Sequence, residues 1–452
     1  MSKIKTIFDP IHGHITITEA MRKFIDTPEF QALRWKQQLG VASFVFPSAT
    51  HNRFEHSIGV SHLAGIMVET IQKQISVYWG CKKLEEPTEV PDDEYRYELW
   101  EDVRLAGLLH DIGHGPFSHL YDDWVRESSS VKADWDHEER SVRLIKTINN
   151  REKIIPDWRI NRICDMVVPG KISFDSNIKW HNQIVANKLC DIDVDKIDYI
   201  MRDSYHLGIK CGGEYERLIR QVKMVNYKGK NVLGWPEKLQ DEIYSLFQTR
   251  YKLHKRFYNH HTVKAIEILL TEGQHLLPDM MSSDSSVLDT NYNSKEIYKR
   301  SLPKMLGEIV LAPNLYKEIC EKIKSFHNDK KNPLLTLKRL NNSIKVYFSI
   351  AKIGFSSDCN NPFLNIPYYN TKYTENIPNG YTKNPTMFEV TNHYNYQEII
   401  VRIFIKNNRK MTKEEELLTG VLTSKLMEEL NQLKPASPNT LGKVETRTLF
   451  EE

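Results

Sequence analysis

The strongest candidate for chemistry is an adjacent His-Asp pair at the end of an apolar stretch, Leu108-Leu109-His110-Asp111-Ile112-Gly113-His114. The pair offers one imidazole nitrogen and one carboxylate oxygen to the same ion, a mixed ligand set that borderline divalent metals accept. His114 follows His110 by four residues, so on a helix the two imidazoles share a face. Because a lone His-Asp pair also fits a helix end with solvated side chains, a metal site requires further ligands from elsewhere in the chain.

Two further segments carry ligands of the same kinds. His56, in the run 51–57, supplies a second imidazole at an expected helix start. Downstream, four aspartates fall within eight residues: Asp191, Asp193, Asp195 and Asp198. Carboxylates this close repel one another unless cations lie among them, and a metal offsets more of that charge than Lys196 alone. A solvated acidic helix face is the alternative, but the interleaved apolar residues Ile192, Val194 and Ile197 favour partial burial.

Histidines are dense between positions 51 and 137, where they occur as His51, His56, His62, His110, His114, His119 and His137. An imidazole is the natural proton donor to an alkoxide leaving group near neutral pH. Asp122 follows His119 by three residues, one step along a helix face, and is placed to orient it.

Two sets of polar residues recur every four positions, which places each set on one face of a helix. The first set is Asp195, Tyr199 and Asp203, and the second is Arg250, His254 and Tyr258. Guanidinium, imidazole and phenol groups together suit phosphates, sugar hydroxyls and a base. The second set also fits an ordinary polar face of a basic stretch, and His260-His261 is equally compatible with a surface pair.

Composition limits the class of protein. The 452 residues are 40% hydrophobic and carry a net charge of only +3, so anion binding must come from local clusters. The six cysteines form no CxxC pair, which indicates free thiols in a reducing compartment. No apolar run approaches the roughly 20 residues that span a bilayer. We expect a soluble protein.

Periodicity predicts a mainly α fold, with a helical core at 1–278, a smaller α/β lobe at 297–434 and a mobile tail at 435–452. Residues 1–15 look extended, and the charged stretch 82–97 and the Pro/Asn/Tyr-rich stretch 360–393 read as loops. The stretch 279–296, rich in Ser, Asp and Asn, is the best candidate for a boundary. We expect helices at 18–37, 55–78, 98–126, 136–168, 181–206, 236–274, 303–326, 334–342 and 412–434. Strand-like runs lie at 344–350 and 399–405.

With these motifs in place, the sequence closely resembles the metazoan dNTP triphosphohydrolases that carry a sterile-alpha-motif domain followed by an HD domain. The matching stretches occur in the same order and cover most of residues 5–275: Asp9–Ile15, Phe24–Gly40, Phe46–Val60, Ala106–His119, Trp135–Ser141, Asp193–Ile209 and Thr249–His260. Beyond 275 the likeness is loose and is best at Tyr396–Lys410. The resemblance implies an HD-domain helical core, followed by a lobe for regulation and oligomerisation.

The resemblance also implies a site. Four ligands, His56, His110, Asp111 and Asp195, would hold one metal (iron, manganese or zinc), with magnesium on the nucleotide phosphates. The triphosphate would be gripped by Arg53, Lys196 and Arg250, and water activated by the metal would attack the α-phosphorus. His119 would protonate the departing 5′ oxygen, supported by His114, His137 and Asp122. The sugar would be read by Gln38, Leu39, Tyr199 and Asp203, and His254 and Tyr258 would lie near phosphates and base.

In this family a nucleotide also regulates assembly. The resemblance places GTP or dGTP at a first activator site formed by Lys5, Asp26, Gln31 and Arg34. A second, dNTP-accepting site would use Val45, Phe46, Arg217, Lys238 and His260. The implied active form is a homotetramer, with a dimer or monomer in the absence of nucleotide. Single-stranded nucleic acid is an optional further partner, and a membrane is not a partner. The expected compartment is nucleus, cytoplasm or both.

The chain departs from the family pattern in places. We expect no sterile-alpha-motif domain before the core, and Phe8 stands where the family usually has an Asn that touches the activator. At the second site Glu242, His261 and Pro236 replace Asn, Lys and Arg. In the tail, Arg447–Phe450 fits a cyclin-docking pattern and Ser437-Pro438 a minimal phosphoacceptor, both of which arise often by chance.

The sequence therefore predicts a GTP- or dGTP-activated enzyme that converts dNTPs into deoxynucleoside and inorganic triphosphate. Two alternatives remain. One is a nucleic-acid or nucleotide sensor with a vestigial HD site, which would have no use for the set His114, His119 and His137. The other is an HD phosphohydrolase for nucleoside monophosphates or cyclic dinucleotides, whose shorter phosphate chains would not need Arg53, Lys196 and Arg250 together.

Overall fold

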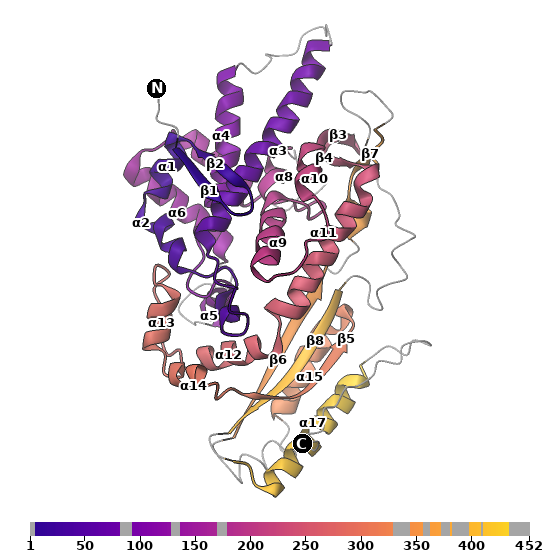
Figure 1. Cartoon of the computed structure of the whole chain (residues 1–452). Helices are drawn as coiled ribbons and strands as arrows, with labels where there is room; N and C mark the ends of the chain where they lie inside the picture. The colour runs from indigo at the N-terminus through magenta and orange to yellow at the C-terminus, as the bar shows by residue number, and fades with distance from the viewer. Residues whose placement is uncertain are drawn as a thin grey trace. The chain divides into compact units, whose positions relative to one another are not determined.

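The computed structural model describes residues 5–81, 93–127, 136–169, 179–328, 344–355, 362–371, 380–381, 397–407 and 410–433 (Figure 1). The chain divides into two compact units. The first comprises 1–253, 276–289 and 362–385, and the second comprises 254–275, 290–361 and 386–452. The expected tail, the helix at 334–342 and the motifs at 437–438 and 447–450 lie outside the described residues.

The first unit is built on two long helices, α3 (Arg53–Cys81) and α4 (Asp93–Leu109), which pack along each other (Figure 1). Gly107 permits this crossing, because a β-carbon there would lie 3.1 Å from the Val60 carbonyl oxygen of α3. The helices α8 (Asn182–Val185), α9 (Val194–His206) and α10 (Tyr215–Arg220) also pack on α3. The buried side chains Leu63, Leu105 and Ile197 belong to this core.

A β-hairpin of β1 (Lys5–Asp9) and β2 (Gly13–Ile17) opens the first unit and packs on α3 through β2. Short helices follow in place of the single helix expected at 18–37: α1 (Glu19–Ile25), α2 (Pro28–Gln31) and a 3-10 turn (Ala32–Trp35). The break falls at Thr27, which caps α2 through its hydroxyl, and at Pro28, which lacks the N–H that would continue α1.

The helix expected at 98–126 is also two helices, α4 and α5 (His119–Glu127), joined by an irregular loop at 110–118. His110 and His114 therefore do not share a helix face, contrary to the prediction from their spacing. The loop is forced by close packing, because a β-carbon on Gly113 would collide with the backbone of His137 and Ser141.

Other expected helices are shorter than their periodic pattern. The stretch 136–168 is α6 (His137–Glu152) and α7 (Asp157–Val167), separated at Lys153, whose φ of 50° ends α6. The stretch 181–206 is α8 and α9, and 236–274 is a 3-10 turn, α11 (Gln240–Leu253), a π-helical turn (His254–Tyr258) and α12 (His261–Glu272). The segment 276–290 ends in α13 (Asp284–Thr290), and α14 (Ser294–Tyr298) follows. A small sheet pairs β3 (Lys223–Tyr227), β4 (Lys230–Pro236) and β7 (Tyr368–Tyr369).

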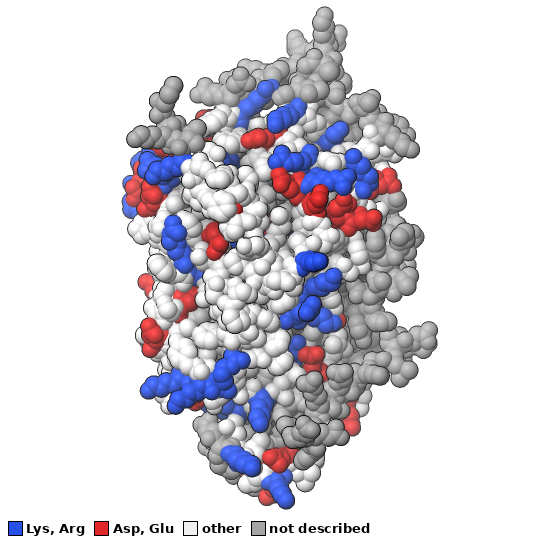
Figure 2. Space-filling model, viewed as in Figure 1, with Lys and Arg blue, Asp and Glu red and all other residues white. Residues whose placement is uncertain are grey.

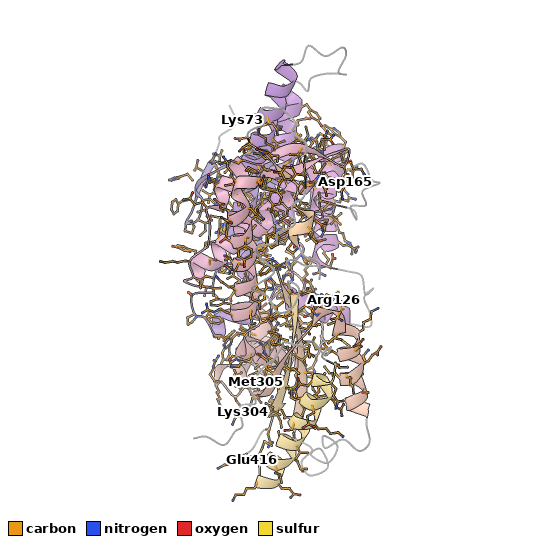
Figure 3. The ribbon with its side chains drawn as sticks, turned by 90° about the vertical axis from the view of Figure 1, so that its right-hand side faces the viewer. Lys73, Arg126, Asp165, Lys304, Met305 and Glu416 are labelled. Atoms are coloured by element: carbon orange, nitrogen blue, oxygen red, sulfur yellow. The ribbon has the colours of Figure 1, made fainter. Side chains whose placement is uncertain are left out.

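The second unit contains an antiparallel sheet in the order β5 (Lys304–Leu311), β8 (Gln397–Lys406), β6 (Lys345–Gly354). The runs expected as strands at 344–350 and 399–405 are β6 and β8, and the charged helix expected at 412–434 is α17 (Lys413–Asn431). The helix expected at 303–326 is wrong in its first part, which is β5, whereas α15 (Tyr316–Asn328) forms the second part. Figure 3 labels Lys304 and Met305 at the start of β5 and Glu416 in the first turn of α17.

The sheet and its helices share one apolar core, which includes Leu311, Ile319, Ile403, Leu422 and Leu426. Burial alternates along the second half of β5, so every second side chain there contacts this core. This period of two fits a strand and not the helix that we expected. The predicted fold class, a helical core with a smaller α/β lobe, is confirmed.

Surface features agree with the composition. Figure 2 shows both basic and acidic side chains on the face it draws, where the basic ones cover the larger part. Among the described helices, none combines the length and apolarity needed to cross a membrane. The described free thiols are Cys164, Cys190, Cys211 and Cys320.

Candidate metal centre and its histidine cluster

The four predicted metal ligands converge from three segments of the first unit. His56 lies in the first turns of α3, His110 and Asp111 follow α4, and Asp195 lies in the first turn of α9. The Nε2 atoms of His56 and His110 lie 3.1 and 3.4 Å from Oδ1 of Asp195. Asp111 presents Oδ1 at 3.4 Å from His110 Nε2 and Oδ2 at 3.6 Å from His56 Nε2. The ligand atoms of His56, His110 and Asp111 all lie within 4.8 Å of one another, close enough to share one ion, and Asp195 contacts both imidazoles of this group.

The ring nitrogens are arranged as metal ligation requires. Among the described residues, neither Nε2 of His56 nor Nε2 of His110 has a hydrogen-bond partner of good geometry, although both are buried. The opposite nitrogens are occupied, because His56 Nδ1 donates to Asp198 at 2.7 Å and His110 Nδ1 donates to the Gly107 carbonyl at 2.8 Å. Such partners fix the tautomer that leaves Nε2 free to bind a metal. The donor set of two imidazoles and two carboxylates fits a borderline divalent cation.

The electrostatics of the site favour a cation. Burial alone would lower the pKa of His56, but the carboxylates of Asp195 and Asp198 raise that pKa to about 10. Burial likewise opposes ionisation of Asp195, yet His110 and His56 hold its pKa well below the usual range. Without a metal the site therefore attracts protons, and metal binding must displace them.

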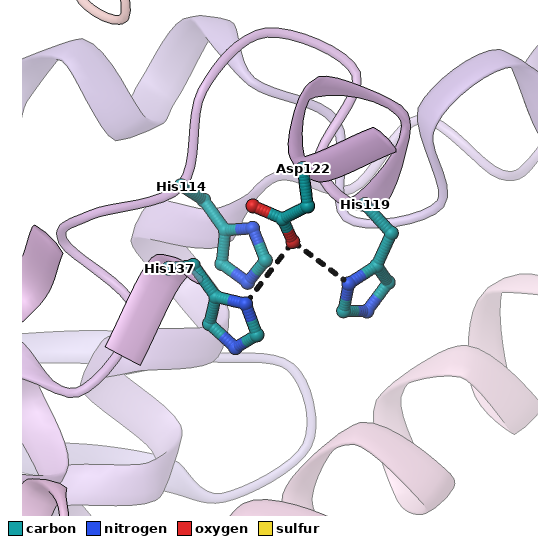
Figure 4. Close-up of side chains that lie close together, drawn as sticks. All are labelled: His114, His119, Asp122 and His137. Carbon is teal, nitrogen blue, oxygen red and sulfur yellow. Dashed lines mark hydrogen bonds and ion pairs between the residues drawn. The ribbon is translucent and has the colours of Figure 1, made fainter. Parts of the chain in front are cut away.

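A second cluster lies beside the ligands and contains His114, His119, Asp122 and His137 (Figure 4). Oδ2 of Asp122 lies 3.1 Å from His137 Nδ1 and 3.5 Å from His119 Nδ1. The rings of His114 and His137 stack with centroids 3.9 Å apart. Oδ1 of Asp122 accepts a short bond from Arg140. Asp122 thus contacts both His119 and His137. The three-residue spacing between His119 and Asp122 predicted the first of these contacts.

The histidines of this cluster differ in their surroundings. His114 is buried, and burial together with the charge of Arg53 keeps its pKa well below the ordinary value, so the ring is neutral. Its Nε2 lies 3.4 Å from Oδ1 of Asp111, which links the cluster to the metal ligands. The side chain of His119 is 75% exposed and that of His137 22%, so His119 is the imidazole of this cluster that is most accessible to a ligand.

The loop that positions His119 is held by buried residues whose role is not visible in the amino-acid sequence. The backbone at Phe117 and Ser118 has φ values of 59° and 58°, a conformation that is unfavourable for residues other than glycine. Asp284 accepts the Phe117 amide at 2.7 Å, and Lys36 donates from Nζ to the His114 carbonyl at 2.7 Å. Asp284 comes from the polar stretch whose composition suggested only a boundary.

Each of the three predicted phosphate-binding cations is bonded to protein groups, and Arg53 is the one that pairs with a predicted metal ligand. Arg53 donates to Ser118 Oγ at 2.8 Å and makes a short ion pair with Asp111. Lys196 bonds Asp191 and Asp193, each at 2.9 Å. Arg250 donates from Nε to the Tyr199 hydroxyl at 3.1 Å.

Residues predicted to contact sugar and base fall into both units. In the first unit, Asp203 accepts from His51 Nε2 at 2.6 Å, and Gln38 carries a buried Oε1 for which the described residues provide no partner. His254 and Tyr258 belong to the second unit, in the π-helical turn, where their rings meet edge to face with centroids 4.8 Å apart. The regular four-residue spacing from Arg250 is lost at this turn because a π-helix has more residues per turn than an α-helix.

Three of the residues predicted for the first activator site lie in neighbouring segments: Asp26 caps the C-terminal end of α1, Gln31 ends α2 and Arg34 lies in the 3-10 turn that follows. Arg34 donates from Nε to Gln31 Oε1 at 2.8 Å and covers the ring of Phe54, while Asp26 pairs with Arg22. The exposed Lys5 lies in β1.

Of the second set, Val45 and Phe46 follow a 3-10 turn (Gly40–Phe44), and Lys238 lies in another (Glu237–Leu239). Arg217 pairs with Glu242, and His260 caps α12 in the second unit.

Comparison with known proteins agrees with this geometry. The HD domain family matches residues 53–203. The chain is 31% identical over 426 residues to the "deoxynucleoside triphosphate triphosphohydrolase SAMHD1 homolog" of Dictyostelium discoideum, covering 90% of this chain and 78% of that protein. It is 36% identical to human deoxynucleoside triphosphate triphosphohydrolase SAMHD1 over 70% of this chain and 50% of the human protein.

A putative HD domain-containing protein of Acanthamoeba polyphaga mimivirus is 29% identical over 88% of this chain and 92% of its own length. The chain spans about half the length of the human relative and more than three quarters of the length of the Dictyostelium discoideum relative. The chain thus belongs to the SAMHD1-like family of HD-domain deoxynucleoside triphosphate triphosphohydrolases.

Proposed function

We propose that this chain hydrolyses dNTPs to a deoxynucleoside and inorganic triphosphate. The observation that carries the proposal is the convergence of His56, His110, Asp111 and Asp195 beside an accessible imidazole, His119. The four ligands would hold one transition metal, iron, manganese or zinc, with magnesium on the phosphates. When bound, such a metal supplies Lewis acidity to a phosphate oxygen and eases the deprotonation of water.

In this proposal His119 is the general acid. Asp122 faces its Nδ1 at 3.5 Å and orients the ring, which leaves Nε2 to give a proton to the departing 5′ oxygen. Water adds to the α-phosphorus, the bond from that phosphorus to the 5′ oxygen breaks, and the three phosphates leave together. His114 is too deeply buried to donate a proton to a ligand and would serve to pack against His137.

Three cations are suited to a triphosphate, which carries a charge of roughly −4. Arg53, Lys196 and Arg250 would provide them, and each must exchange part of its present bonding for phosphate oxygens. Arg53 is the best placed, because its ion pair with Asp111 keeps the guanidinium at the metal centre. This number of cations favours a triphosphate over a monophosphate substrate.

Selectivity for deoxyribose would come from Gln38, Leu39, Tyr199 and Asp203. A leucine beside C2′ crowds an added hydroxyl, while a carboxylate accepts the 3′-hydroxyl. Burial raises the pKa of Tyr199 to about 12, so its hydroxyl stays a donor at neutral pH.

Regulation by nucleotide is the second part of the proposal. GTP or dGTP would bind at Asp26, Gln31 and Arg34 and promote a tetramer by bridging copies of the chain. The exposed aromatic residues Phe8 and Trp35, each 67% exposed, lie in the same N-terminal segments and are suited to such contacts.

A direct assay tests both parts. The purified, metal-loaded protein is incubated with dGTP alone, with dATP alone and with dATP plus GTP, and inorganic triphosphate is measured. We expect release with dGTP and with dATP plus GTP but little with dATP alone. No release under any condition rejects the hydrolase, and equal release with and without GTP rejects the activator.

A further inference from the structure

Asp198 is a fully buried carboxylate behind the metal centre, and four donors surround it. Its Oδ2 accepts from His56 Nδ1 at 2.7 Å and from Arg202 Nε at 3.0 Å. Its Oδ1 accepts from His12 Nε2 at 2.6 Å and from a second nitrogen of Arg202 at 3.0 Å. A carboxylate has about four lone-pair sites, so Asp198 is saturated.

These contacts fix the state of a metal ligand. Because Asp198 can only accept, a neutral His56, the form that binds a metal, carries its one proton on Nδ1 and presents the Nε2 lone pair toward Asp195 and Asp111. The ring is also held in orientation by the same bond. Asp198 therefore prepares His56 to bind a metal, as partners behind a ligating histidine generally do.

The other side of Asp198 belongs to the N-terminal hairpin. His12 lies in the turn between β1 and β2, and its side chain is only 5% exposed. Asp9 of the same turn accepts the amides of Ile11 and His12 on Oδ1, both at 2.9 Å, and accepts Arg202 on Oδ2 at 2.8 Å. The turn is thus anchored by two side chains to the pair Asp198–Arg202.

The packing of α3 leaves room for this network. Gly59 lies one helical turn beyond His56, and a β-carbon on Gly59 would collide with Asp198 Oδ1 and with Arg202. The glycine lets the buried ion pair approach the helix that carries the metal ligand. The hairpin, the ion pair and His56 therefore form one continuous set of contacts within the first unit.

We propose that His12 and Asp9 are positioning residues for the metal centre, so that docking of the hairpin and metal affinity are a single coupled equilibrium. The inference rests on the metal site of the proposed function. Since Lys5 and Phe8 lie on the same hairpin, a ligand or partner that holds the hairpin in place tightens metal binding. By reciprocity, bound metal tightens hairpin docking to the same extent.

The test compares two histidines of one hairpin. His12 contacts Asp198, whereas the exposed His14 packs its ring against Phe8 with centroids 5.4 Å apart. The metal-stripped full chain and the variants His12→Ala and His14→Ala are titrated with Mn²⁺, and free Mn²⁺ is counted by its electron paramagnetic resonance signal. Circular dichroism verifies that each variant folds.

We expect His12→Ala to weaken Mn²⁺ binding about 10-fold, the lower end of the range for residues behind a metal ligand. His14→Ala should stay within about twofold of the unmodified chain by the same argument. His12→Gln, which keeps an N–H donor at a similar reach, should recover most of the loss. This recovery separates positioning from a general loss of stability.

A second readout follows the coupling in the other direction. Hydrogen exchange of the amides of residues 5–17 should slow when Mn²⁺ binds the unmodified chain and should not respond in Asp198→Asn. Equal Mn²⁺ affinity in His12→Ala and His14→Ala, or a hairpin that does not respond to metal, overturns the proposal. Mn²⁺ binding without dNTP hydrolysis would reject the proposed function alone, and a chain that binds no Mn²⁺ would reject both.

Discussion

Nε2 of His56 lies 3.1 Å from Oδ1 of Asp195, although the two residues come from different helices, α3 and α9. Nothing but the folding of the first unit brings them together. With His110 and Asp111 they form a set of two buried imidazoles, the buried carboxylate of Asp111 and the partly exposed carboxylate of Asp195, and Nε2 of each imidazole faces carboxylate oxygen.

Removing a ligand should release the metal. Asp195→Ala takes away the carboxylate that both imidazoles share, so we expect bound transition metal to fall from about one ion per chain to near zero, with loss of hydrolysis. Metal content is measured by plasma mass spectrometry after dialysis. Asp165→Ala is the control, because Asp165 is an exposed carboxylate on α7 (Figure 3). Retention of a full complement of metal by Asp195→Ala would remove Asp195 from the site.

Loss of the proton donor should slow the reaction without releasing metal. For His119→Ala we expect kcat for dGTP to fall by about 10²–10⁴-fold, the usual contribution of a positioned general acid. Metal content should be unchanged, since His119 touches none of the four ligands. His275→Ala, an exposed histidine of the second unit, serves as the matched control. An unchanged kcat in His119→Ala would show that His119 is not the general acid.

Arg53 should not tolerate replacement by lysine. Its guanidinium bonds Ser118 through Nε and Asp111 through a second nitrogen. Lysine has a single ammonium nitrogen, which cannot make both contacts in the same geometry. We expect Arg53→Lys to lower kcat/KM for dGTP by about 100-fold through misplacement of the phosphates. Arg126→Lys, on an exposed face of α5, controls for the substitution itself (Figure 3). Similar steady-state kinetics for the two variants would contradict the assignment.

The buried carboxyl of Asp284 should make stability depend on pH. Burial raises the pKa of Asp284 from 3.8 to about 6, although the amides of Gln37 and Phe117 oppose the shift. The folded chain therefore holds this proton more tightly than the unfolded chain does. Its contribution to stability is present at low pH and is lost as the pH rises to about 6.

Comparison with Asp284→Asn isolates this contribution. The free energy of unfolding of the unmodified chain, minus that of Asp284→Asn, should decrease by about 2 kcal/mol between pH 4 and pH 6 and level off above about pH 7. Urea denaturation at several pH values measures the difference. A difference that grows with pH over this range would mean that the carboxyl is stabilised in its charged form.

Sequence reasoning found the residues whose chemistry is visible in their type and spacing. The pair His110-Asp111, the aspartate segment around Asp195 and the histidines up to His137 could be proposed as parts of one site, and the structure brings them together. The relation between His119 and Asp122 followed from helical spacing, because both lie on α5.

Residues that act through a buried partner gave no such signal. Asp198 looked like one of four repelling carboxylates until His12, His56 and Arg202 were seen around it. Lys36 and Asp284 lie far apart in sequence, and their role in holding the loop before His119 depends wholly on tertiary contacts.

Predicted helix boundaries were wrong for a related reason. Apolar periodicity runs through residues 98–126, but close packing at Gly113 and the left-handed backbone at Phe117 interrupt the helix where the chemistry lies. Lys304–Leu311 forms a strand instead of the expected helix because it pairs with β8. β8 lies about 90 residues further along the chain, so the local sequence pattern could not indicate this pairing.

The most direct test of the account follows the oxygen atom of the attacking water. The metal-loaded protein is incubated with dGTP in ¹⁸O-labelled water, and the products are identified by mass spectrometry. We predict unlabelled deoxyguanosine and inorganic triphosphate that carries one ¹⁸O, because water attacks the α-phosphorus and the 5′ oxygen leaves with a proton from His119. Pyrophosphate with deoxyguanosine monophosphate, ¹⁸O in the nucleoside, or no products from protein that holds its metal would contradict it.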